Sequence, residues 1–160
     1  MNIRVASRTI GMAIAFSALV NAAGPAAAAA AVHCFLPQEI EAQEAARYQV
    51  KLMVLSDTCG DTVYRRFTVR NRAEIVQYQG ELIAHFRRTG ARNAERTFDD
   101  YLTSLANEIS LDAGHTPLAS LCSQSAQFLA EADHLDHEKF RRYIAAKAAE
   151  RKSAYPQCRG

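Results

Sequence analysis

Hydrophobic side chains recur every three or four residues along most of the chain beyond residue 36, and no segment sustains a strict hydrophobic–polar alternation. Spacings of three and four place side chains on one face of an α-helix, whereas alternation is typical of a half-buried β-strand. The pattern therefore predicts an all-α fold.

Signals that begin and end helices divide this pattern into five expected helices. Pro37 suits the first position of a helix that continues to about Leu55, because the N–H that proline lacks has no partner there. Asn71, with Glu74 three residues later, resembles a capping box at the start of a second helix, which begins there or slightly earlier, and Gly90 ends that helix. The third helix is the most regular, with one hydrophobic face formed by Phe98, Leu102, Leu105 and Ile109.

The last two helices have clear starting residues. Thr116 and Pro117 are expected as the cap and first residue of the fourth helix, after the third ends at Gly114. Asp136 is expected to cap the fifth helix, which ends before Pro156. Five helices joined by short links predict an up-and-down bundle.

Residues 1–31 resemble a secretory signal peptide. Arg4 and Arg8 precede an apolar run from Ile10 to Val20, and the alanine-rich stretch that follows offers Ala-x-Ala cleavage sites. The apolar run is shorter than the roughly 20 residues that a membrane span requires, so no span is expected. We expect cleavage near Val32, which leaves one helical domain over residues 32–160 in the periplasm or secreted.

Export changes the interpretation of the net charge. The chain has 19 Lys and Arg against 17 Asp and Glu, and loss of Arg4 and Arg8 would leave the two equal. The basic character of the whole chain therefore gives no reason to expect a nucleic-acid partner.

The chain contains four cysteines, Cys34, Cys59, Cys122 and Cys158, all within the expected mature domain. An even number of cysteines in an oxidising compartment favours two disulfides. Their wide spacing fits neither a redox Cys-x-x-Cys pair nor a zinc site. The spacing by itself leaves the pairing open.

Three segments carry a resemblance to a known group of proteins. They are LMVLSDTC at 52–59, YRRF at 64–67 and YLTSLANEIS at 101–110. Together they resemble small secreted proteins of alphaproteobacteria that have no assigned function, and the resemblance extends over the first four helices. It implies a helical exported domain in which Cys59 pairs with Cys122, which leaves Cys34 for Cys158. Five alternating helices would put the chain ends at opposite ends of the bundle, so the second pair requires the tail to turn back or the bundle to depart from simple alternation.

One cluster of residues offers a metal-binding alternative. His134 and His137 lie among carboxylates, and two imidazoles can bind a divalent metal when further ligands join them. If Asp136 caps a helix, however, His134 lies outside that helix and the two rings need not converge. We therefore expect no metal site and no cofactor. No catalytic residue is assigned either, because His85 has no evident partner and the common hydrolase motifs are missing.

Charge is distributed unevenly along the chain. Residues 65–96 contain eight Arg and three Glu. Residues 99–138 contain eight acidic residues and no Lys or Arg. Beyond residue 138 there are seven basic residues and one Glu. One interpretation is that these segments pair with one another inside the bundle. The other is a basic surface for an anionic envelope component or an acidic protein, formed by Arg87, Arg88, Arg92, Arg141 and Arg142.

The favoured functional hypothesis is a non-catalytic exported binding or accessory module of the bacterial envelope. A periplasmic protein that binds a divalent metal through His134 and His137 is the first alternative. An enzyme of unrecognised type is the second.

Overall fold

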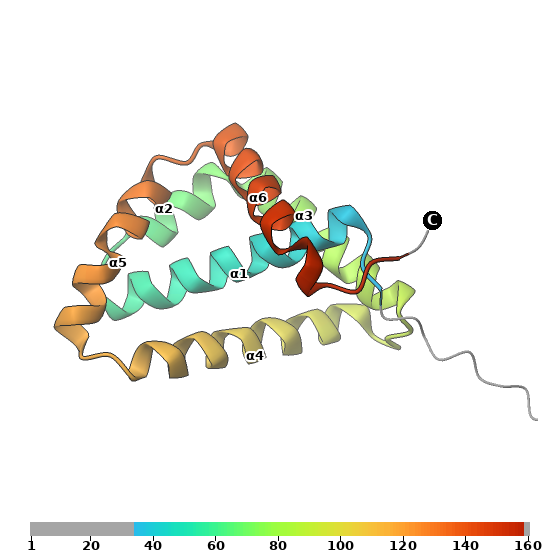
Figure 1. Cartoon of the computed structure of the whole chain (residues 1–160), viewed down its shortest axis with the longest axis horizontal. Coiled ribbons are helices and arrows are strands. Elements are labelled where there is room, and N and C mark those ends of the chain that lie inside the picture. The colour runs from blue at the N-terminus through green and yellow to red at the C-terminus, as the bar shows by residue number, and fades with distance from the viewer. Residues whose placement is uncertain (1–33, 159–160) are drawn as a thin grey trace, which may run out of the picture. The chain divides into compact units, whose positions relative to one another are not determined.

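The computed structural model describes residues 34–158, so the expected signal peptide at 1–31 lies outside the described residues. The described part forms an all-α bundle, as the sequence predicts (Figure 1). Its helices are α1 (Pro37–Thr58), α2 (Val63–Arg70), α3 (Arg72–Arg88), α4 (Ala94–Gly114), α5 (Leu118–Asp133) and α6 (His137–Arg151), followed by a 3₁₀ turn (Lys152–Ala154). Over residues 34–158, no helix combines the length and apolar character needed to cross a membrane.

The chain runs along the bundle four times, with α1 as the first pass, instead of the five times that were expected (Figure 1). Helices α2 and α3 follow each other back along α1, α4 runs forward beside it, and α5 and α6 together return. An even number of passes brings the two ends of the described chain together. The N–H of Phe35 donates to the carbonyl of Pro156 at 2.8 Å, and the N–H of Cys158 donates to the carbonyl of Phe35 at 3.1 Å. The expected conflict between helix count and chain ends is therefore absent.

Helix α2 was not expected from the sequence. Its start is fixed by two side-chain acceptors: the Asp61 carboxylate accepts the N–H of Val63 at 2.6 Å, and the Ser56 hydroxyl accepts the N–H of Tyr64 at 3.2 Å. Only Val63 and Phe67 are buried along its eight residues. Two buried positions are too few to reveal a helical period in the sequence.

The helix start expected at Asn71 is confirmed, but the capping box expected there is not formed. Because α2 leads almost directly into α3, the N–H of Asn71 already donates to the carbonyl of Phe67 at 2.9 Å. The side-chain amide of the fully buried Asn71 donates instead to the carbonyls of Phe67 and Leu135, at 3.1 Å each. Asn71 thus ties the break between α2 and α3 to the turn between α5 and α6.

The other expected helix starts differ in accuracy. Helix α5 begins one residue later than expected, with Pro117 in the cap position in place of Thr116. The cap at Asp136 is confirmed, since its carboxylate accepts the N–H of Lys139 at 2.9 Å.

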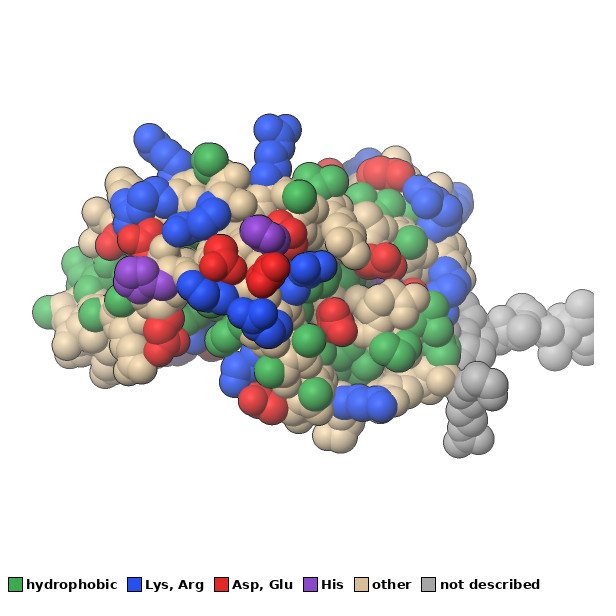
Figure 2. All heavy atoms as spheres, turned by 90° about the horizontal axis from the view of Figure 1, so that it is seen from above, with side chains coloured by type: hydrophobic (Ala, Val, Ile, Leu, Met, Phe, Trp, Pro, Cys, Tyr) green, Lys and Arg blue, Asp and Glu red, His purple; other side chains and the backbone are tan. Residues whose placement is uncertain are grey.

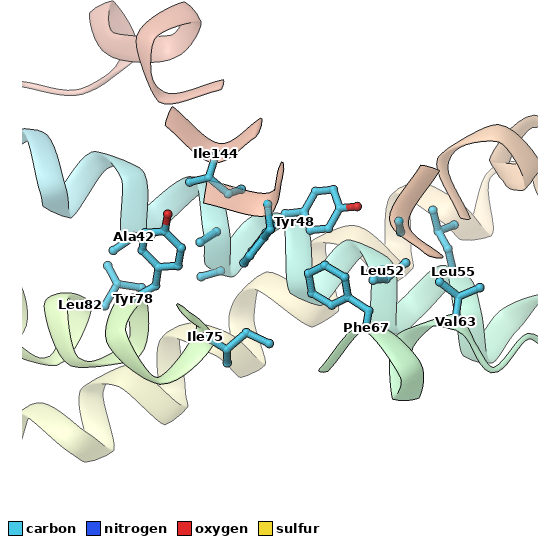
Figure 3. Packing of buried hydrophobic residues seen from close by; sticks show 14 of the residues in the cluster. Ala42, Tyr48, Leu52, Leu55, Val63, Phe67, Ile75, Tyr78, Leu82 and Ile144 are labelled. Carbon is cyan, nitrogen blue, oxygen red and sulfur yellow. The ribbon is translucent and has the colours of Figure 1, made fainter. Parts of the chain in front are cut away.

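The hydrophobic core lies between α1 and the helices packed around it (Figure 3). Tyr48 of α1 is its centre, with ring centroids 5.5 Å from Phe67 of α2 and 5.6 Å from Phe140 of α6. Phe67 and Phe140 meet edge to face at 4.9 Å, an arrangement that aromatic rings favour. Each of these buried rings contributes about 1.5–3 kcal/mol of hydrophobic stabilisation. This core fixes α1 as the element against which the other helices are positioned.

Candidate functional site

Both disulfides join the cysteine pairs that were expected. Cys59 at the end of α1 bonds to Cys122 in α5, and Cys34 bonds to Cys158 near the other end of the chain. They close loops of 63 and 124 residues. On the chain-entropy model such loops correspond to about 4 and about 5 kcal/mol of stabilisation. The disulfides therefore fasten opposite ends of α1 to the rest of the fold.

The structure does not bring the five arginines of the expected basic surface together. Arg87 and Arg88 lie at the C-terminal end of α3, and Arg92 follows in the next turn. Helix α6, which carries Arg141 and Arg142, begins beside the middle of α3, where the Phe140 and Tyr78 rings lie 5.9 Å apart. The break between α5 and α6 causes this offset, because α6 starts partway along the bundle. At 1.5 Å per residue, Tyr78 and Arg88 are about 15 Å apart along α3.

Several of the basic side chains are paired within the chain. Arg87 binds Glu95 at 2.9 Å, Arg142 lies 3.6 Å from Glu138, and Arg88 is bound to the buried Glu39. Over the side formed by α5 and α6, Figure 2 shows Lys and Arg side chains interspersed with Asp and Glu. The basic and acidic segments themselves meet where Arg66 and Arg70 of α2 lie 2.9 Å and 3.5 Å from Asp133 of α5, which agrees with the interpretation that the segments pair within the bundle.

His134 and His137 occupy the turn between α5 and α6. His134 is the residue at the C-terminal end of α5, whereas His137 is the first residue of α6. Between them, Asp136 is used as the helix cap. Over residues 34–158, no group of three or more His, Cys, Asp or Glu side chains is arranged to hold a metal ion.

A buried polar cluster formed by Glu39, His85 and Arg88 joins α1 to α3. The Glu39 side chain is 4% exposed and accepts the N–H of Leu36 at 2.8 Å. The Nε of Arg88 donates to the same carboxylate at 3.0 Å, and the Nδ1 of His85 lies 3.1 Å from it. Burial alone would raise the pKa of the Glu39 carboxyl, but the hydrogen bonds from Arg88, Leu36 and His85 together hold that pKa below its usual 4.5.

The buried polar cluster also holds the N-terminal end of the described chain. The Phe35 ring stacks on the His85 ring with centroids 4.3 Å apart, and Tyr155 packs edge-on against Phe35 at 5.2 Å. The Nη2 of Arg88 donates to the carbonyl of Cys34 at 2.8 Å. The cluster therefore lies directly under the Cys34–Cys158 disulfide.

Glu39 and His85 have the residue types of a catalytic acid–base pair, but their surroundings do not suit catalysis. Their side chains are 4% and 6% exposed, and the neighbouring Phe35 ring covers the imidazole. A general acid or base has to come within hydrogen-bond reach of a substrate. The buried polar cluster is therefore interpreted as a structural fastening of the chain ends.

A groove of about 500 Å³ lies between α1, α4 and α5. Helix α4 runs beside α1, and α5 leaves the end of α4 at a steep angle, so the three helices diverge (Figure 1). The residues that line the groove are Arg47, Lys51, Leu55, Ile109, Asp112, Ala113, Leu121, Gln124, Ser125 and Phe128. Its volume lies in the range of small-molecule sites, and its lining is divided equally between apolar and polar or charged residues.

Apolar side chains near this groove are incompletely packed. Ile109, Leu121 and Phe128 are only partly buried, although all three lie on helix faces directed toward α1. Leu111 and Leu118, on either side of the turn between α4 and α5, are 69% and 60% exposed. A smaller groove of about 250 Å³ adjoins the first and shares Ala113 and Leu121 with it. The turn between α4 and α5 thus presents accessible apolar surface.

Sequence reasoning missed this groove, because its residues come from three helices far apart in the chain. One signal was present in the sequence. Arg47 and Lys51 are one helical turn apart, and so are Glu108 and Asp112. Glu108 follows Arg47 by 61 residues, and Asp112 follows Lys51 by the same number. Such a matched spacing is expected where two helices run parallel and in contact.

Searches against known protein families, characterised proteins and solved structures found no match. Function is therefore inferred from the residues and geometry of this chain.

Proposed function

We propose that the protein is a non-catalytic binding protein exported to the bacterial envelope, and that its ligand occupies the groove between α1, α4 and α5. The observation that carries this proposal is the groove itself. It combines about 500 Å³ of space with apolar walls from Leu55, Ile109 and Phe128 and with charged groups at its edge. A site of this kind favours a small molecule that has an apolar body.

Two further observations support the proposal. The N-terminal pattern of residues 1–31 is typical of a secretory signal, and two disulfides are typical of a protein from an oxidising compartment. The acid–base pair of the buried polar cluster is enclosed by internal contacts, whereas the groove is open to solvent. The accessible surface therefore offers a groove for binding, whereas the acid–base pair is out of reach of a substrate.

The proposal is tested with a neutral naphthylamine dye, which fluoresces when it enters an apolar site. We expect the purified mature protein to bind the dye with one-to-one stoichiometry. Ala113→Phe places a ring in the groove and should abolish binding. Ala119→Phe adds the same ring at an exposed position of α5 that does not line the groove and should leave binding unchanged.

Two results of the dye experiment would contradict the proposal. Dye binding that is undetectable in the wild-type protein, or that is equal in Ala113→Phe and Ala119→Phe, would place any ligand elsewhere. Export is tested separately by cell fractionation and by N-terminal sequencing of the purified chain, which should begin near Val32.

A further inference from the structure

Two pairs of opposite charges face each other across the line of contact between α1 and α4. These helices run parallel, since Tyr101 of α4 donates to Gln43 of α1 and, further along both helices, Arg47 of α1 donates to Glu108 of α4 at 3.1 Å. One turn beyond Arg47 and Glu108 in the same direction lie Lys51 and Asp112. The parallel register therefore makes Lys51 and Asp112 the next pair.

The first pair is joined and the second is not. Among the residues described, Lys51 and Asp112 form no ion pair with each other or with any other side chain, whereas both line the groove. The ammonium group of Lys51 lies instead 4.9 Å from the centre of the Phe128 ring on α5. The groove thus lies beside the Arg47–Glu108 ion pair, at the point where the next two opposite charges on α1 and α4 are not joined.

The wall formed by α1 contains hydrogen-bond donors that have no acceptor within the described part of the chain. Besides the ammonium of Lys51, the Nε of Arg47 is buried and has no acceptor within the described part of the chain. Water does not reach this nitrogen, so it lies behind the groove wall, and the Lys51 ammonium is the donor that this wall presents to a ligand. The facing wall, on α4, offers the Asp112 carboxylate, which can accept a hydrogen bond but donates none.

We propose that the ligand of this groove is a short apolar peptide of two or three residues with free ends. Its carboxylate binds Lys51, its ammonium binds Asp112, and its apolar side chains lie against Leu55, Ile109, Leu121 and Phe128. This inference rests on the proposed function and deepens it by naming the ligand class.

Charge and length favour this ligand over other amphipathic molecules. A purely anionic ligand leaves Asp112 facing a like charge, and a purely cationic one does the same to Lys51, whereas a zwitterion satisfies both. The two side chains lie beyond ion-pair distance of each other. A dipeptide, whose extended backbone spans roughly 7 Å, separates its charges further than a single amino acid, which carries both on one carbon.

Four probes of the same shape test the inference by calorimetric titration of the mature protein at pH 6.5, where a terminal amine is protonated. They are Leu-Leu, N-acetyl-Leu-Leu, Leu-Leu amide and N-acetyl-Leu-Leu amide, which carry both charges, the negative charge, the positive charge and neither. We expect Leu-Leu to bind most tightly. Removal of either charge should weaken binding by about fivefold to tenfold, in line with charged hydrogen bonds at a partly exposed site.

Two variants assign each charge to its residue. Lys51→Met should abolish the advantage of the free carboxylate and keep that of the free amine, and Asp112→Asn should do the reverse. Lys152→Met and Asp100→Asn are the matched controls, because both residues are exposed and lie outside the groove. Neither control should change the order of the four probes.

The possible failures are distinguishable. Equal binding of Leu-Leu and its doubly capped form, or tighter binding of Leu-Leu by Asp112→Asn, would overturn the zwitterion assignment. Tightest binding of N-acetyl-Leu-Leu would overturn it in favour of an amphipathic anion and would leave the proposed function intact. If the neutral dye binds in the groove and none of the four probes does, the peptide inference fails alone; if the dye also fails to bind, the proposed function fails with it.

Discussion

Replacement of Glu39 by Gln tests whether the buried polar cluster stabilises the fold. The substitution keeps the size of the side chain and removes its charge, so the Arg88 guanidinium loses its counter-charge. Removal of one partner of a fully buried pair is unfavourable by about 3–5 kcal/mol. The Arg88 side chain is 35% exposed, so water replaces part of the lost interaction. We therefore expect Glu39→Gln to lower the free energy of unfolding by about 2–3 kcal/mol at pH 7.

The assay is urea unfolding followed by circular dichroism, with Glu138→Gln as the matched control. Glu138 lies 3.6 Å from Arg142, and the two side chains are 61% and 71% exposed. An exposed pair of this kind contributes about 0–1 kcal/mol, so the control should unfold almost as the wild type does. A loss for Glu39→Gln that is no larger than that of Glu138→Gln would refute the structural role of the cluster.

The stability difference between the wild type and Glu39→Gln should depend on pH. The pKa of Glu39 is lower in the folded protein than its usual 4.5, so the folded state favours the ionised carboxyl. Its contribution is fully present above about pH 4.5 and is lost as the pH falls through the lower, folded-state pKa. The difference in stability between wild type and Glu39→Gln should therefore shrink on acidification below pH 4.5. A difference that stays constant or grows there would contradict the assignment.

Three further predictions follow from the fastenings at the turns and the chain ends. Replacement of both Cys34 and Cys158 by Ser should lower the free energy of unfolding by up to about 5 kcal/mol, and non-reducing peptide mapping of the wild type should find these two residues joined. Asn71→Ala should lower it by about 2–3 kcal/mol in urea unfolding, because a fully buried amide that donates to two carbonyls is lost. Zinc titration should show only weak binding that is unchanged when His134 and His137 are both replaced by Ala, and a tight one-to-one complex lost in that variant would contradict this.

The sequence was sufficient to predict the helices that carry a long, regular hydrophobic face. Helices α1, α3, α4, α5 and α6 were all expected, because each repeats its buried positions over three or more turns. Helix α2 was missed, since its two buried residues, Val63 and Phe67, do not make a period. The error in helix number changed the topology, because five passes separate the chain ends and four passes join them.

The polar contacts between helices were not predictable from local sequence. Glu39 meets His85 and Arg88 across 46 and 49 residues, and nothing near any of the three marks the contact. The expected basic surface failed for the same reason, since the position of Arg88 relative to α6 depends on where α6 begins. Only the matched spacing of Arg47 and Lys51 with Glu108 and Asp112 could have pointed to the groove, and it requires α1 and α4 to be recognised as neighbours.

The most direct test of the central claim is to locate the bound ligand by NMR. Leu-Leu added to the ¹⁵N-labelled mature protein should shift amide signals of the groove residues on all three helices, among them Lys51, Asp112 and Leu121. Signals of the buried polar cluster near Glu39 and of the turn at His134 should stay in place. Shifts confined to those two regions, or the same groove shifts in Ala113→Phe as in the wild type, would contradict the account.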